Sequence, residues 1–212
     1  VDCSGNQLTA LNLSATNALM TLNCENNRLS TLTFNSTGYP IHVDCSGNQL
    51  TELNTDTMQF TRYLDCSDNQ LTRLNVRNCS VVETFSCQGN KLERLDLTSD
   101  GKYHALSLNA IGEGYVGYAM EQKEDGATTY TVVATPVEGS VFQGWYTNRN
   151  CTTLVTTNST IDVTEIAPAD AKDYYAKFDE GGGAVEVPKG YNVNDYLKLR
   201  TFLEQTDEEG VK

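Results

Sequence analysis

The sequence has few of the side chains on which most catalytic and metal sites depend. Only two histidines, His42 and His104, occur among its 212 residues. It also lacks the glycine-rich phosphate loop, the H-E-x-x-H pair and the G-x-S-x-G elbow, which are typical of nucleotide-binding, zinc-dependent and serine-hydrolase sites. Catalysis would have to come from paired carboxylates, so we expect a protein that is not an enzyme and that holds neither a metal nor a cofactor.

Basic side chains and long apolar segments are also scarce. Lysine and arginine total 15 against 28 aspartates and glutamates, which gives a formal net charge of -13. Such a chain has little with which to neutralise phosphates or an anionic lipid surface, so neither nucleic acid nor a membrane surface is an expected partner. No apolar run approaches the roughly 20 residues of a membrane-spanning helix, so no direct membrane insertion is expected.

The sequence contains instead a strict internal repeat. The opening stretch VDCSGNQLTALNL returns at residues 43–55 as VDCSGNQLTELNT, with two letters changed. The underlying period is 21 residues, and it is carried by Cys3, Cys24, Cys45, Cys66 and Cys87 and by Asn6, Asn27, Asn48, Asn69 and Asn90. A leucine follows each of these asparagines by two positions and again by five. A fixed period of this size predicts a solenoid, in which each turn stacks on the next.

One unit, LMTLNCENNRL at residues 19–29, fits the pattern L-x-x-L-x-L-x-x-N-x-L with cysteine in the third leucine position. Over residues 1–111 the chain therefore resembles the leucine-rich repeat family. The resemblance implies a solenoid with a parallel β-sheet on its concave side. The stretch ALSL at residues 105–108 is expected to supply a sixth, degenerate strand in register.

Strand geometry assigns the repeated residues to structural roles. Side chains alternate between the two faces of a strand, so Leu22 and Cys24 face one way while Asn23 faces the other. The cysteines are therefore predicted to form a reduced, inward-facing ladder. Neighbouring thiols would lie about 4.8 Å apart with parallel Cβ directions, an awkward geometry for a disulfide. We interpret the asparagines as turn residues that satisfy backbone groups.

The 21-residue period ends near Ile111, where alternating β-branched and aromatic segments begin. Within them, VVATPVEGSVFQGWYT at residues 132–147 and YYAKF at residues 174–178 resemble the internalin B-repeat family, including its divergent forms. The resemblance implies a small β-rich, β-grasp-like domain over residues 112–178, of a kind used in bacterial surface proteins. Its tryptophan, Trp145, is expected in the core of a domain this small.

Residues 179–212 are expected to form a glycine-rich linker followed by a short amphipathic helix. The segment DEGGGAVEVPKG has the composition of a linker. Asn192 is a candidate N-cap, and Tyr196, Leu199 and Leu203 lie on one stripe of the predicted helix. This segment resembles the start of a further leucine-rich array, so the natural protein is expected to continue with another module.

The outward positions of the predicted strands form two neighbouring rows of polar side chains. One row reads Asp2, Asn23, Asp44, Asp65 and Ser86, and the other reads Thr21, His42, Tyr63 and Thr84. We predict a ligand-binding strip on the concave face, because stacked turns hold side chains at fixed spacing, and we place it at His42, Asp44, Tyr63, Asp65 and Asn23. An exposed aromatic such as Tyr63 favours binding. The alternative is a solvated polar face that holds no ligand.

These rows offer little chemistry for catalysis. His42 shares strand parity with Asp44 and lies opposite Cys45, which rules out a cysteine and histidine dyad within that strand. The two histidines would be about three turns, or roughly 14 Å, apart, so they cannot grip one ion together. Asp44 and Asp65 are the one plausible carboxylate pair, and they would be about one strand spacing apart, closer than glycosidase pairs usually are.

Two functions therefore remain. The chain is either a non-enzymatic recognition module that binds a protein or a glycan, or a passive structural spacer in a larger surface protein. In both cases the family resemblance implies an extracellular or cell-surface location, and we expect a monomer. The N-terminus lacks the basic and apolar regions of a signal peptide, and Val1 begins in mid-repeat, so we expect that a signal peptide has been removed.

Overall fold

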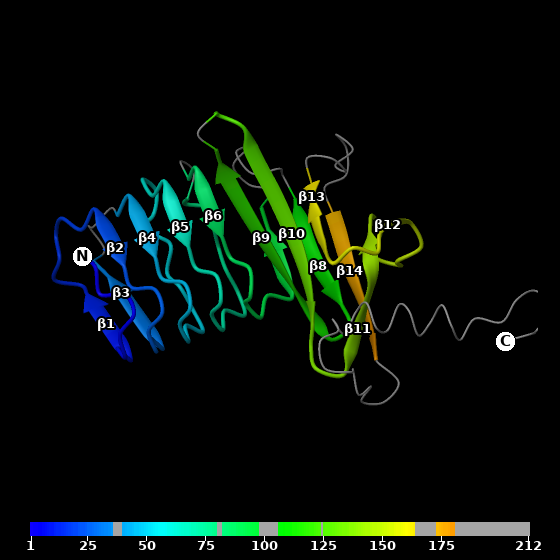
Figure 1. The fold of residues 1–212 in the computed structure, drawn as a ribbon, viewed down its shortest axis with the longest axis horizontal. Coiled ribbons are helices and arrows are strands. Elements are labelled where there is room, and N and C mark those ends of the chain that lie inside the picture. Colours follow the sequence, from blue (N-terminus) through cyan, green and yellow to red (C-terminus); the bar gives the residue numbers. More distant parts are fainter. Residues whose placement is uncertain (36–39, 80–81, 98–105, 124, 164–172, 181–212) are drawn as a thin grey trace, which may run out of the picture.

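A computed structural model describes residues 1–35, 40–79, 82–97, 106–123, 125–163 and 173–180. These residues are rich in β-strand and contain almost no helix, and they form a solenoid that runs into a second module of longer strands (Figure 1). From residue 181 onward, the predicted linker and helix lie outside the described residues. In the part of the chain that is described, no helix is long and apolar enough to cross a membrane.

Four short strands form the parallel ladder that the 21-residue period predicts. They are β2 (Thr21–Asn23), β4 (His42–Asp44), β5 (Tyr63–Asp65) and β6 (Thr84–Ser86). Residues one period apart are paired, so Val43 lies between Leu22 and Leu64. These middle residues are fully buried, whereas the first and third residues of each strand face outward. The prediction of a β-solenoid is confirmed.

The residue two positions after each cysteine turns the chain with a positive φ. The angle is 63° at Gly5, 53° at Asn26, 61° at Gly47, 51° at Asp68 and 65° at Gly89. Glycine, asparagine and aspartate are the residues that reach this left-handed region most readily. Each turn therefore carries a local signal that ends its strand at the same place.

Each inner asparagine joins two adjacent turns, and Asn48 shows the pattern. Its Nδ2 donates to the carbonyl oxygens of Cys24 at 3.0 Å and of Cys45 and Ser46 at 3.1 Å. Its Oδ1 accepts the N–H of Leu29 at 2.9 Å. The same set of bonds recurs at Asn27, Asn69 and Asn90. A side-chain amide offers both donors and an acceptor, so it can satisfy buried backbone groups of both turns. The predicted role of these asparagines is confirmed.

The inward direction of the cysteine ladder is also confirmed. Full burial is found at Cys24, Cys45, Cys66 and Cys87, while Cys3 in the first turn is partly exposed. Each buried thiol donates to a carbonyl oxygen of the next strand, as Cys45 Sγ does to Asp65 at 3.4 Å. Burial raises the pKa of Cys87 to about 12 and that of Cys45 well above its usual value. These thiols are therefore neutral at physiological pH and pack as small apolar groups.

The strand that follows β6 in the sheet runs in the opposite direction. It is β9 (Gly114–Gln122), and it pairs Met120 with Phe85 and Ala119 with Ser86. The amide and the thiol of Cys87 both donate to the Tyr118 carbonyl oxygen, at 2.9 and 3.4 Å, as the other buried cysteines donate to the next turn. The prediction that residues 105–108 supply a sixth strand of this ladder is therefore wrong.

The last two residues of that stretch, Ser107 and Leu108, belong to a strand of a different sheet. Strand β8 (Ser107–Ile111) pairs antiparallel with β7 (Arg94–Asp96) and parallel with β14 (Asp173–Glu180). Alternating apolar residues predict a half-buried strand but do not say which sheet it joins. Leu106 and Leu108 are fully buried, and Ser107 between them is buried as well. The domain boundary predicted at residue 111 stays a prediction. Strand β7 precedes that residue, yet it pairs with β8 in a sheet of the second module.

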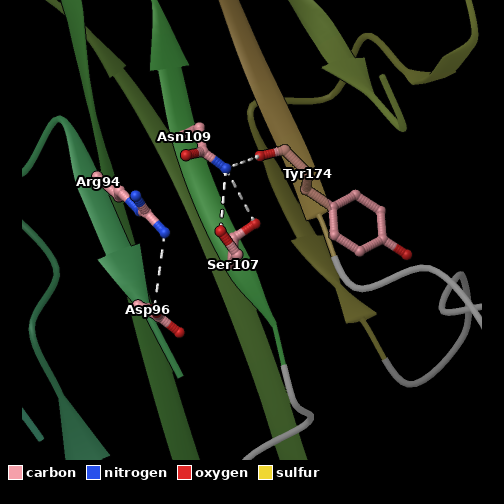
Figure 2. A network of polar contacts seen from close by, with 5 residues as sticks. All are labelled: Arg94, Asp96, Ser107, Asn109 and Tyr174. Atoms are coloured by element: carbon pink, nitrogen blue, oxygen red, sulfur yellow. Dashed lines mark hydrogen bonds and ion pairs between the residues drawn. The ribbon is translucent and has the colours of Figure 1, made fainter. Parts of the chain in front are cut away.

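Polar side chains form contacts within β7 and β8 and, at one point, between β8 and β14 (Figure 2). Asn109 Nδ2 donates to the Ser107 hydroxyl at 3.2 Å and to the backbone oxygen of Tyr174 at 3.4 Å. Arg94 and Asp96 form an exposed ion pair at 3.6 Å, which contributes little to stability. The bond from Asn109 to Tyr174 joins β8, which follows the solenoid in sequence, to β14, the last described strand.

The second module encloses an aromatic core between two sheets. One sheet extends the ladder through β9, β10 (Thr128–Pro136) and β13 (Thr160–Asp162), and the other has the order β12-β11-β14-β8-β7, with β11 at Ser140–Tyr146 and β12 at Leu154–Thr156. Tyr118, Trp145 and Tyr174 are fully buried, and Trp145 meets Phe142 edge-on with ring centroids 6.0 Å apart. The expected place of Trp145 in the core is confirmed.

A separate two-stranded sheet lies elsewhere on the solenoid. It pairs β1 (Ala10–Leu13) with β3 (Thr31–Phe34) in parallel and again joins residues one period apart. The first two turns are thus joined twice, by the Asp2–Asn23 bridge at the end of the main ladder and by the β1–β3 pairing.

Candidate functional site

The structure brings all five predicted site residues together on the outer face of the main ladder. Asn23, Asp44 and Asp65 are paired neighbours in one row, and His42 and Tyr63 are paired neighbours in the other. All five side chains are partly exposed. We call these residues the strip. It is rigid, because the buried middle residue of each three-residue strand fixes the direction of the two outward side chains.

His42 and Tyr63 form a stacked pair. Their ring centroids are 4.1 Å apart and the ring planes differ by 7°. Adjacent strands of a sheet are about 4.8 Å apart, so two flat rings at the same position of successive turns meet face to face. The neighbours of this pair in its row are the short side chains of Thr21 and Thr84, which leave the stack accessible from the side.

Asp44 and Asp65 each use one carboxylate oxygen to hold the turn that follows. Asp44 Oδ1 accepts the N–H of Ser46 at 3.1 Å and its hydroxyl at 2.7 Å. Asp65 Oδ1 accepts the same two groups of Ser67 at 2.9 and 2.6 Å. Sequence reasoning missed this second role, although the repeated letters D-C-S carried its signal, since aspartate bonds the backbone two residues on in such turns.

Burial and the acidic neighbours also change the titration of the strip. Burial, and then the nearby charge of Asp44, raise the pKa of Asp65 against the lowering effect of its bonds to Ser67. The pKa of Tyr63 rises to about 12, through burial and through the charges of Asp44, Asp65 and Glu25. The Tyr63 phenol therefore stays protonated at physiological pH and can donate a hydrogen bond beside two acceptors.

The row of Asp44 and Asp65 continues beyond the solenoid. Ser86 pairs with Ala119 of β9, Ala119 with Thr131 of β10, and Thr131 with Asp162 of β13. Since paired residues share a face of the sheet, the strip opens onto a surface that crosses all seven strands. Sequence reasoning missed this continuation, because an antiparallel strand breaks the 21-residue count.

The two carboxylates of the strip are already hydrogen-bonded within the chain. Among the described residues, no group of three or more His, Cys, Asp or Glu side chains is placed to hold a metal. Asp44 and Asp65 lie about one strand spacing apart and are already engaged by Ser46 and Ser67. What the geometry offers is a flat aromatic stack beside a row of hydrogen-bond acceptors.

Comparison with known proteins places the second module. Residues 104–182 match the family described as the divergent InlB B-repeat domain, so the chain contains an internalin-like B-repeat module. One solved structure that matches is the functional domain of InlJ from Listeria monocytogenes, described as including a cysteine ladder. It is 24% identical, with 52% of this chain and 29% of that chain covered and a TM-score of 0.35. The chain thus spans less than a third of that structure's length. No curated protein gives a significant match.

Proposed function

We propose that the chain is a non-enzymatic recognition module of a bacterial surface-displayed or secreted protein, and that it binds a protein or a glycan through the strip. We assign the repeats to the leucine-rich type and the second module to a β-grasp-like fold. The match of residues 104–182 to the divergent B-repeat family supports a place in a surface protein. The extracellular location and the monomeric state belong to the same proposal.

The observation that carries the proposal is the stacked pair of His42 and Tyr63. The two rings, with centroids 4.1 Å apart, form an aromatic surface in a row whose other residues have short polar side chains. A ligand that packs against them meets side chains already held by the ladder, so little conformational entropy is lost on binding. Preorganised aromatic residues of this kind commonly supply most of the binding energy at an interface.

The row beside the stack determines which ligands fit. Asp44, Asp65 and Asn23 offer acceptor oxygens, and the neutral Tyr63 phenol offers a donor. Acidic acceptors next to an aromatic surface suit either a basic protein segment or the hydroxyl groups of a sugar whose ring packs on the stack. Binding of a basic protein weakens as salt is added, whereas binding of a neutral glycan hardly changes.

A passive spacer is the second candidate. It is favoured by the continuous sheet across the junction, where Cys87 bonds to Tyr118 of β9 as though to a further turn. Such a junction joins the solenoid and the B-repeat module through direct pairing of β6 with β9. A stiff unit of this kind is suited to projecting another domain from a surface.

The test is an array of extracellular proteins and glycans probed with the chain, with Tyr63→Ala and with Thr84→Ala. Thr84 is the matched control, because it occupies the same row on the next strand. We expect Tyr63→Ala to weaken binding by about tenfold, as loss of an aromatic anchor does, and Thr84→Ala to leave it within about twofold. If no partner distinguishes Tyr63→Ala from the parent, the spacer becomes the better assignment.

A further inference from the structure

The turns of the solenoid pair regularly on the ladder side, whereas on the side that carries β1 and β3 only the first two turns pair as strands among the described residues. Turns one and two are joined there by the β1–β3 pairing and by a bond from Asn35 Nδ2 to Asn17 Oδ1 at 2.7 Å. Among the described residues, β3 pairs with β1 alone, so its other edge has no strand partner there. The third turn therefore does not extend this second sheet.

The third turn is bonded to the fourth turn instead. The hydroxyl of Thr55 donates to the carbonyl oxygen of Asn75 at 2.5 Å, and Asn78 Nδ2 donates to Asp56 Oδ1 at 3.3 Å. Thr55 is buried at a repeat position that holds an apolar residue in the other turns, namely Leu13, Phe34, Val76 and Leu97. Its hydroxyl thus replaces an apolar contact by a directional bond toward the fourth turn.

A groove of about 600 Å³ lies between the second and third turns. One wall is formed by the consecutive residues 30–34, and the other by residues 52–54 together with Asp56 and Thr57. Successive residues of a strand point to opposite faces, so a groove lined by all of them runs along the edge of β3 rather than over one face. The backbone groups on that edge are therefore available to a ligand.

The lining of the groove carries charge of one sign. Glu52 and Asp56 are exposed carboxylates, and no lysine, arginine or histidine is among the lining residues. Leu32 and Leu53, both buried, supply an apolar floor. A ligand that fits must offer backbone donors and acceptors along one edge, an apolar side chain inward and a basic side chain outward.

We propose that this groove binds an extended peptide that alternates apolar and basic residues and adds to the free edge of β3 as a third strand. Main-chain bonds to β3 supply affinity, as in other cases of strand addition, and the alternating side chains supply specificity. The apolar side chains pack toward Leu32 and Leu53, and the basic ones reach Glu52 and Asp56. The site is separate from the strip and does not depend on the function proposed for it.

The experiment uses a fluorescent peptide of about six residues, the usual length of a strand, alternating valine and lysine. The first control is the same peptide with alternate amides N-methylated, which keeps the charge but removes donors needed for strand addition. The second control is a peptide alternating valine and glutamate. We expect saturable binding of the first peptide in fluorescence anisotropy, about tenfold weaker binding after N-methylation, and none of the acidic peptide.

The matched protein variants are Glu52→Lys in the groove and Glu138→Lys in the exposed turn between β10 and β11. Both change the net charge equally, but only Glu52→Lys is expected to weaken binding, by about fivefold. Tyr63→Ala is expected to bind the peptide as the parent does, which separates this site from the strip. Equal weakening by both charge variants, equal binding of the N-methylated peptide, or no saturable binding would each overturn the proposal.

Discussion

The solenoid and the second module are stabilised by different kinds of side chain. In the solenoid, a small polar or weakly polar residue recurs at each turn and bonds to the backbone of the next, as Asn48 and Cys45 do. In the second module, Trp145, Tyr118 and Tyr174 fill the space between two sheets. The stability of the hydrogen-bonded ladder depends on the polar groups of each residue, whereas the stability of the aromatic core depends on the volume of its side chains. Substitutions of each kind can test this difference.

The largest effect is expected from placing a charge in the ladder. Cys45→Asp buries a carboxylate within the hydrophobic core, and we expect the free energy of unfolding to fall by about 4 kcal/mol or more. Cys45→Ala removes the thiol without adding charge and should cost only about 1 kcal/mol. Urea denaturation followed by circular dichroism measures both. Similar losses for the two variants would mean that the ladder is more open to water than its full burial indicates.

The aromatic core should respond to lost volume. We expect Trp145→Ala to lower the free energy of unfolding by about 4 kcal/mol, because a large cavity replaces a fully buried side chain. Its neighbour Tyr146 is only partly buried, so Tyr146→Ala should cost less than about 1 kcal/mol. The continuous sheet predicts one unfolding transition for both variants. Two transitions in Trp145→Ala, with the solenoid unchanged, would show that the junction does not couple the modules.

A smaller loss is expected where the ladder loses hydrogen bonds alone. Asn48→Ala leaves the Leu29 N–H without its acceptor and removes one of the two amide donors to the Cys24 carbonyl, at an expected cost of about 3 kcal/mol. Asn6 is the matched control, since it lies in the first turn, is exposed, and bonds only to Cys3 and Ser4 of its own turn. Asn6→Ala should cost less than about 1 kcal/mol in the same urea titration.

Alkaline pH should weaken the ladder selectively. Burial raises the pKa of Cys45 above its ordinary value of 9.0, so the unfolded chain loses this proton first and stability is lost as pH rises past 9.0. Below that pH the contribution is fully present. The slope of stability against pH above 9.0 should be shallower in Cys45→Ala by about 1.4 kcal/mol per pH unit. Identical slopes would contradict a raised pKa at this thiol.

The smallest effect should distinguish the two roles of Asp44. Asp44→Asn keeps an oxygen that can accept the Ser46 N–H, so stability should change by less than about 0.5 kcal/mol. Asp44→Ala removes the acceptor and should cost about 1 kcal/mol. If both variants are as stable as the parent, the turn does not need this bond, and the aspartate is free for another role.

The sequence was most informative at positions where the same residue type has the same structural role in every turn. The spacing of the cysteines and asparagines predicted the solenoid, the inward thiols and the neighbours within the strip, because parallel pairing carries the same count from turn to turn. That count fails at β9, whose pairing with β6 is antiparallel. The apolar alternation of residues 105–108 could not say which sheet they would join.

Interactions set by single departures from the repeat were also beyond sequence reasoning. Thr55 replaces the apolar residue of the other turns, and its hydroxyl bonds to the Asn75 carbonyl oxygen of the fourth turn. The bond from the Ser46 hydroxyl to Asp44 was missed for a different reason, because the repeated letters D-C-S carried its signal but did not show which group would engage the carboxylate. Which acceptor a side-chain hydroxyl bonds to depends on the groups that lie within hydrogen-bond distance in the folded chain.

The lengths of the edge strands bear on how the protein behaves at high concentration. The main sheet ends in β2 and β13, and the second-module sheet ends in β12 and β7, and all four of these strands have three residues. Short edges offer little backbone for another chain to pair with, which is a known protection against edge-to-edge aggregation. Many copies crowded together would therefore have few places at which to pair with one another, and the four-residue outer edges of β1 and β3 are the longest of those that the described sheets leave open.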